Sequence, residues 1–241
     1  MAVLDRGRIA LDGPRDRRNH LGIVPAVLRE QPWVVVAVHA RVEHALARAS
    51  KVHPQIREEF EYGGLRLRTT ASTSGARIAV TVDVAFGDAL EPGAEVIDYP
   101  CMLDLPAPRL RAYARETVVA EKFQAMVALG RANSRMKDFY DIWLLSRQFE
   151  FDGETLLKAI RLTLEQRGTG LPDEIVAFSQ DFIAAKQIQW NVFRKKLEQE
   201  HVSSEFADIV MKVKEFIKPI ALALASKKPP PSKWSPPEPW V

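Results

Sequence analysis

The hydrophobic pattern predicts strands in the first half of the chain and helices in the second. The clearest strand signal lies at 78–86, where apolar residues alternate with small or polar ones. Turn residues precede this run at 74–75, and a shorter alternating run at 65–68 follows the glycines at 63–64. Two alternating runs joined by a short turn are typical of a β-hairpin, so we predict a hairpin over 64–86.

The signals around this hairpin are shorter. A β-branched run at 33–38 is a candidate buried strand, and a short helix is predicted to follow it at 39–50. Residues 1–20 are rich in Arg and Asp without a sustained period, which predicts a weakly ordered arm. Repeated prolines between 92 and 108 predict a long connecting segment.

Helix periodicity begins near Arg115 and continues with few breaks. The predicted helices cover 115–130, 136–148, 153–167, 174–200 and 204–225. Strands followed by helices indicate an α+β fold, in which a sheet is joined to a helical domain. Prolines crowd the last residues, 226–241, and proline supports neither a helix nor a strand ladder. This tail is therefore predicted to be extended and disordered.

Composition narrows the class of protein only slightly. Hydrophobic residues make up 46% of the 241 residues, which is enough for a globular core. The formal net charge of +3 permits a nucleic-acid partner without requiring one. A single cysteine, Cys101, excludes an internal disulfide and fits a reducing cytoplasm. No apolar stretch is long enough to cross a membrane, so we expect no membrane partner.

Two charged residues stand where charge is unusual. Asp83 interrupts the middle of the predicted strand at 78–86, a position that carboxylates disfavour. It lies either on a solvated face or in a cleft, where it would suit Mg²⁺. Lys122 borders the predicted core stripe of Val119, Phe123 and Met126. Its ammonium either reaches to water or enters a cleft, where it would suit a triphosphate.

Asp138 and Asp141 are three residues apart and share one face of the predicted helix over 136–148. Asp138 in the first turn also complements the helix dipole, and Asn133 or Ser134 is a candidate cap. With Arg135 and Lys137 beside them, the two acids are interpreted as part of a cationic phosphate site. The alternative interpretation is a set of surface ion pairs, each worth under about 1 kcal/mol.

In order along the chain, these residues form a series that resembles the AbiEii/AbiGii nucleotidyltransferase family, the toxin halves of bacterial type IV toxin–antitoxin and abortive-infection systems. The resemblance rests on Tyr62-x-Gly64-x-Arg66, Val82-Asp83-Val84-Ala85-Phe86-Gly87-Asp88, Tyr99-Pro100, Glu116-Thr117-Val118-Val119-Ala120-Glu121-Lys122-Phe123-x-Ala125-Met126 and Asn133-Ser134-Arg135-Met136-Lys137-Asp138-Phe139-Tyr140-Asp141. It covers about two-thirds of the chain, from about residue 55 to 220.

The resemblance implies a polymerase-β-like nucleotidyltransferase sheet, here partial, at 55–112 and a helical domain at 113–225. It implies transfer of a nucleotide from a nucleoside triphosphate to an RNA, possibly tRNA, or to a protein acceptor. Asp83 resembles a catalytic carboxylate that binds Mg²⁺, and Lys122 resembles the nucleotide-phosphate lysine, with Arg135 and Lys137 as further phosphate contacts. Asp138 and Asp141 resemble an acidic motif needed for activity. A cognate antitoxin protein is the implied partner.

The N-terminal part of the chain lacks a motif that the family carries. No Gly-Ser or Gly-Gly followed by Asp-x-Asp precedes Asp83, although two such acids hold the metal in the family. Residues 1–54 are predicted to be an atypical, partly disordered segment that does not resemble the family, as truncation, a wrong start codon or a frameshift would produce. On this interpretation, the chain is either an impaired nucleotidyltransferase or a non-catalytic relic that acts only as a binding domain. A third hypothesis is a basic RNA-binding domain, which requires the arginines at 66, 68, 131 and 135 to share one face.

Overall fold

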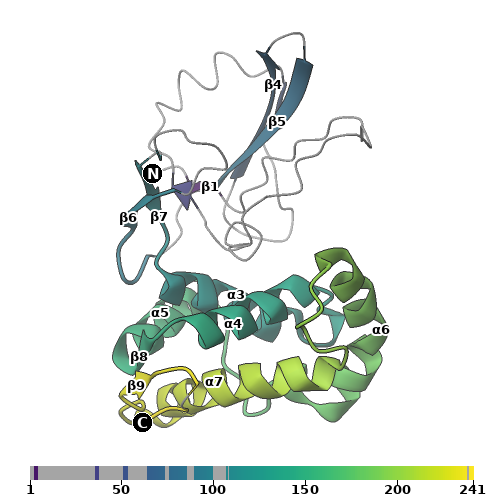
Figure 1. Ribbon diagram of the computed structural model, residues 1–241. Helices are drawn as coiled ribbons and strands as arrows, with labels where there is room; N and C mark the ends of the chain where they lie inside the picture. Colours follow the sequence, from purple (N-terminus) through teal and green to yellow (C-terminus); the bar gives the residue numbers. More distant parts are fainter. Residues whose placement is uncertain are drawn as a thin grey trace. The chain divides into compact units, whose positions relative to one another are not determined.

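The computed structural model of the protein describes residues 3–4, 36–37, 51–53, 64–73, 76–85, 90–99, 107, 109–237 and 239–241. The chain divides into two compact units, Met1–Asp88 with Gly93–Tyr113 and Ala89–Pro92 with Ala114–Val241. Strands make up most of the described part of the first unit, and helices dominate the second (Figure 1). The predicted α+β fold is confirmed, and this composition is consistent with a partial nucleotidyltransferase fold.

The predicted hairpin is confirmed in the first unit. Strands β4 (Gly64–Thr73) and β5 (Ala76–Ala85) pair antiparallel along their whole length, with Gly64 opposite Ala85. Two short strands, β1 (Val3–Leu4) and β3 (Lys51–His53), extend the hairpin into a four-stranded sheet of order β1-β5-β4-β3. Apart from Val3–Leu4, the arm predicted at 1–20 lies outside the described residues.

A second sheet in this unit was only partly predicted. It has the order β2-β7-β6, formed by Val36–Ala37, Arg109–Ala112 and Glu95–Asp98. The strand predicted at 33–38 contains β2, whereas β6 lies in the segment predicted to be a connection and β7 follows that segment directly. Each has four residues, too few for a visible alternation, and β7 pairs with a strand far away in the sequence. The helix predicted at 39–50 lies outside the described residues.

The helical unit follows the predicted pattern closely. Its helices are α3 (Arg115–Leu129), α4 (Met136–Gln148), α5 (Gly153–Gln166), α6 (Gln180–Leu197) and α7 (Phe206–Ser226). Short 3₁₀ turns occupy Gly130–Ala132 and Val176–Phe178. The helix predicted over 174–200 therefore starts later than expected. It begins after Ser179, whose hydroxyl accepts a hydrogen bond from the Phe182 backbone N–H at 3.3 Å.

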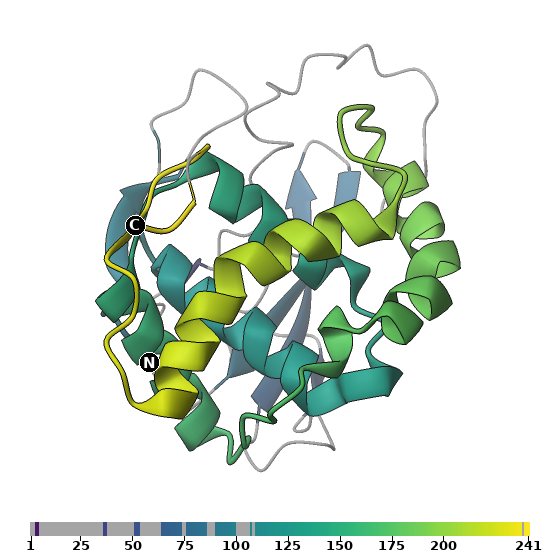
Figure 2. The same ribbon diagram turned by 90° about the horizontal axis from the view of Figure 1, so that it is seen from below.

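Helix α4 lies at the centre of this unit and contacts α3, α6 and α7. Figure 2 shows α7 crossing the unit, where it packs against α4, α5 and α6. The face of α4 toward α7 is aromatic: the rings of Phe139 and Phe206 lie edge to face with centroids 5.1 Å apart. Every residue of α4 from Asp138 to Ser146 is buried. Polar side chains on this helix therefore lie in the interior and need partners there.

The tail predicted to be disordered is docked onto the helical unit, so that prediction is wrong for the described residues. Strand β9 (Lys233–Trp234) pairs with β8 (Phe151–Asp152), and the Trp234 indole N–H donates to the Ser146 carbonyl at 2.6 Å. Trp240 stacks on Phe216, with ring centroids 5.6 Å apart. The prediction considered the prolines of the tail and overlooked its two tryptophans, Trp234 and Trp240. The area that these rings bury outweighs the poor strand propensity of the neighbouring prolines.

Candidate functional site

Lys122 lies on α3 at the edge of the core. Val119, Phe123 and Met126 beside it are fully buried, as predicted. Only 16% of the Lys122 side chain is exposed, and its ammonium does not simply reach to water. It lies 3.0 Å from Asp138 Oδ1 and 2.6 Å from Asp141 Oδ2, both on α4. The lysine is therefore held between two helices by two carboxylates.

The two carboxylates share one face of α4, as their spacing predicts, but they are not on the surface. Asp141 is fully buried, and the Asp138 side chain is 7% exposed. The interpretation as surface ion pairs is therefore wrong, because α4 is packed on several sides by other helices. A buried carboxylate is costly unless cations and hydrogen bonds neutralise it, so Lys122 and the two acids depend on one another.

Two further cations complete this cluster, which we call the Lys122 cluster: Lys122, Arg135, Lys137, Asp138 and Asp141. The Lys137 ammonium lies 2.5 Å from Asp141 Oδ2, and an Arg135 guanidinium nitrogen lies 4.0 Å from Asp138 Oδ2. Three cationic side chains of the described residues thus lie around these two carboxylates. Arg135 and Lys137 are partly exposed, and cationic side chains at a surface attract an anion such as a phosphate.

In this environment the pKa values of Lys122 and Lys137 shift in opposite directions. Burial lowers the pKa of Lys122, but the negative charges of Asp141 and Asp138 outweigh that effect and raise the net pKa above the ordinary 10.5. Burial also lowers the pKa of Lys137, and there the attraction of Asp141 does not compensate, partly because Lys122 repels it. Lys122 is consequently the more firmly charged of the two.

The residues before α4 do not form the predicted helix cap. Arg135 is the N-cap residue and makes no side-chain capping bond, so neither Asn133 nor Ser134 caps the helix. Instead the Asn133 side-chain oxygen accepts from the Arg135 backbone N–H at 2.9 Å. Among the described residues, two buried side-chain atoms have no hydrogen-bond partner, Asn133 Nδ2 and Asp141 Oδ1. Both belong to the segment that forms the cluster.

Asp83 lies in the other unit, on β5, where the register places it opposite Arg66. Its role as a metal-binding carboxylate stays a prediction. The shared face required for the RNA-binding hypothesis also stays untested, because Arg66 and Arg131 belong to different units.

The Lys122 cluster does not fit a magnesium site. Mg²⁺ needs oxygen ligands that are free to bind it. Here Lys122 occupies an oxygen of each aspartate, and Lys137 shares the one on Asp141. In the part of the chain that the structure describes, no three His, Cys, Asp or Glu side chains gather as metal ligands would. The cluster is thus a cation-rich site, and any metal that the family uses needs other residues.

A second polar network on α3 was not predicted. Arg167 donates to Glu121 at 3.1 Å and to Gln124 at 3.0 Å, and the Gln124 amide donates to the Thr169 hydroxyl at 2.8 Å. Gln124 is buried, so these bonds satisfy it. They tie the loop after α5 to the helix that carries Lys122. No sequence period marks this network, because its members come from two distant segments.

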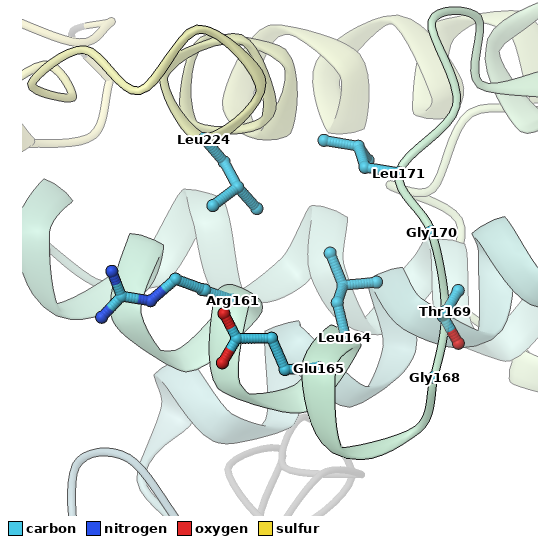
Figure 3. A pocket seen from close by; sticks show the side chains of 8 residues that line it. All are labelled: Arg161, Leu164, Glu165, Gly168, Thr169, Gly170, Leu171 and Leu224. Atoms are coloured by element: carbon cyan, nitrogen blue, oxygen red, sulfur yellow. The ribbon is translucent and has the colours of Figure 1, made fainter.

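The same loop borders a cleft of about 290 Å³ (Figure 3). Its lining combines the backbone of 168–170 with leucines and two charged side chains: Arg161, Leu164, Glu165, Gly168, Thr169, Gly170, Leu171 and Leu224. None of the predicted site residues lines it. Among the described residues that line it, Arg161 is the one cation, and Glu165 on the same helix offsets that charge. The cleft therefore is not the predicted phosphate site.

In the part of the chain described, no helix is both long and apolar enough to cross a membrane. Comparison with known proteins bears on identity more directly. A family model, nucleotidyl transferase AbiEii toxin of the type IV TA system, matches residues 34–212. No curated protein and no solved structure matches the chain.

The match begins inside the segment 1–54 that was predicted not to resemble the family, so that prediction is wrong from residue 34 onward. The matched range includes β2, which pairs with β7 and belongs to the second sheet. A two-residue strand carries too little pattern to be recognised without its partner. The matched range also includes every predicted site residue and covers most of the chain. The chain therefore belongs to the AbiEii nucleotidyl transferase toxin family of type IV toxin–antitoxin systems.

Proposed function

We propose that this chain transfers a nucleotide from a nucleoside triphosphate to an RNA or protein acceptor, and that Lys122 binds the triphosphate. The observation that supports this role best is the position of Lys122, charged and held by two buried carboxylates within a cation-rich cluster. An ammonium group binds phosphate oxygens as a compact point charge. In the transfer, an acceptor oxygen bonds to the α-phosphorus, its proton passes to solvent, and pyrophosphate leaves.

In this proposal Asp138 and Asp141 position the Lys122 ammonium rather than bind a metal. Asp83 is the proposed metal-binding carboxylate, and Mg²⁺ is the ion expected from the family. Bound there, it would neutralise phosphate charge. The remaining phosphate contacts are assigned to Arg135 and Lys137. The proposed partner is a cognate antitoxin protein, as expected for a type IV toxin family.

We propose further that transfer is impaired. No Asp-x-Asp sequence occurs in the 241 residues, and one carboxylate is a poor ligand set for Mg²⁺. The same observation favours a second candidate function, a non-catalytic domain that binds the triphosphate or a protein partner without turnover. The two candidates differ in one property, the release of pyrophosphate.

The test is transfer of radiolabel from each of four α-labelled nucleoside triphosphates, with Mg²⁺, to total RNA and to the protein itself. We expect weak transfer that Lys122→Ala abolishes. The matched control is Lys158→Ala, which removes an exposed lysine from α5 of the same unit. Transfer that survives Lys122→Ala would refute the role of Lys122. The absence of transfer with every nucleotide, from folded protein, would favour the binding domain.

A further inference from the structure

We infer that Lys137 is a positioning residue that neutralises Asp141 when Lys122 moves to bind a triphosphate. The inference rests on the proposed function, since it assumes that Lys122 binds phosphate. It changes the roles assigned to Lys137 and Arg135, which the sequence suggested as direct phosphate contacts. The geometry points to an exchange of counter-ions within the Lys122 cluster.

The first observation is that both lysines bind the same oxygen. Asp141 Oδ2 lies 2.6 Å from the Lys122 ammonium and 2.5 Å from the Lys137 ammonium, while Asp141 Oδ1 is buried without a hydrogen-bond partner. Lys137 stands one helical turn before Asp141 on α4, so its contact does not depend on α3. Loss of the Lys122 contact would therefore leave Asp141 paired.

The second observation is the complete burial of Asp141. Removing the only counter-ion of a buried carboxylate is strongly unfavourable, which would oppose any movement of Lys122. A retained partner removes most of that cost. Lys137 is suited to this task because its side chain is 46% exposed, so it can adjust without disturbing the core.

The third observation is that Asp138 has an equivalent arrangement. Lys122 contacts Asp138 Oδ1, whereas Arg135 approaches the other oxygen, Oδ2, at 4.0 Å. When Lys122 turns to a triphosphate, Arg135 can neutralise Asp138 and Lys137 can neutralise Asp141. Each carboxylate then keeps one cation, and the Lys122 charge becomes available to the ligand.

One test needs no ligand. Side-chain NMR of Lys137 would follow its titration in the wild type and in Lys122→Met. Lys137 loses its proton while Lys122 is still charged. If the lysines share Asp141, Lys122→Met removes a competitor and a repelling charge, so Lys137 should lose its proton at a higher pH. Unchanged titration of Lys137 would overturn the inference. Lys122→Arg keeps the charge and should leave the titration close to that of the wild type.

The second test measures binding of inorganic triphosphate by calorimetry. We expect Lys122→Met to abolish binding and Lys137→Met to weaken it about tenfold, equivalent to ~1.4 kcal/mol. In the Asp141→Asn background, Lys137→Met should change the affinity little, because a neutral amide needs no counter-ion. If Lys137→Met weakens binding as much in that background as in the wild type, then Lys137 contacts phosphate directly and the inference is wrong.

The same series separates the inference from the proposed function. If the wild type does not bind triphosphate, or Lys122→Met binds as well as the wild type, the proposed function fails and the exchange fails with it. If Lys122→Met loses binding while Lys137→Met keeps it, only the exchange is refuted. Circular dichroism of each variant, with Lys137→Arg as the conservative substitution, checks that the helices are intact.

Discussion

The Lys122 ammonium on α3 lies 2.6 Å from Asp141 Oδ2 on α4, where Asp141 is fully buried. This pair joins two helices across the interior and also holds the lysine that we propose binds triphosphate. Stability and function therefore depend on the same contact. Substitutions here should change both, and the two effects can be measured separately.

Asp141→Asn should destabilise the protein by about 3 kcal/mol, because it leaves the largely buried Lys122 with one carboxylate fewer and removes one partner of Lys137. Chemical denaturation monitored by circular dichroism would measure the change. Asp138→Asn is the matched comparison and should cost less, since Lys122 keeps its shorter contact with Asp141. Equal costs for the two variants would contradict the central role of Asp141.

The stabilising effect of Lys122 should depend on pH in one direction. Its folded-state pKa lies above the ordinary 10.5, so its contribution is complete below that pH and is lost as the pH rises through the folded-state pKa. The difference in free energy of unfolding between the wild type and Lys122→Met should be flat below about pH 10.5 and shrink above it. A difference that shrinks well below this pH would argue against the ion pairs.

The contribution of Lys137 to stability should depend on pH in the opposite direction, because burial lowers the pKa of Lys137 below 10.5. As the pH rises through the lowered pKa, Lys137 sheds its proton in the folded state first, which favours folding. The wild type should therefore gain stability relative to Lys137→Met in this range. Side-chain NMR of both lysines would check the order, with Lys137 titrating before Lys122.

The cap of α5 offers a prediction outside the cluster. The Asp152 carboxylate accepts from the Thr155 backbone N–H at 2.8 Å and from its hydroxyl at 2.7 Å, and these bonds lower the pKa of Asp152. Asp152→Ala should cost about 1 kcal/mol at neutral pH. The cost should disappear as the pH falls through the folded-state pKa, below 3.8. Asp152→Asn, which retains an accepting oxygen, should cost less in the same urea titrations.

Gly153→Ala should release the docked tail. A Cβ atom at this position would meet the Pro231 carbonyl oxygen at 1.8 Å, and backbone cannot yield as a flexible side chain would. Trypsin cleavage after Lys233, followed by mass spectrometry, should become faster. Gly170→Ala is the control, since nothing lies within 4 Å of its added Cβ. Equal cleavage rates in the two variants would show that the tail docks without the close approach at Gly153.

Local features of the sequence determined most of the helical unit. The helices α4 and α5 were predicted almost to the residue, because a period of 3.6 and nearby glycines depend only on neighbours along the chain. The hairpin of β4 and β5 followed from alternation in the same way. The common face of Asp138 and Asp141 was predictable too, since a spacing of three residues fixes it on any helix.

Only the tertiary structure decided which surroundings those residues have. The burial of Asp141 depends on helices that pack around α4, and its contact with Lys122 joins segments that share no local pattern. The pairing of β7 with β2 and the docking of Trp234 likewise join distant parts of the chain. Periodicity shows which side chains share a face, whereas burial and ion pairing depend on what packs against that face, which no local pattern encodes.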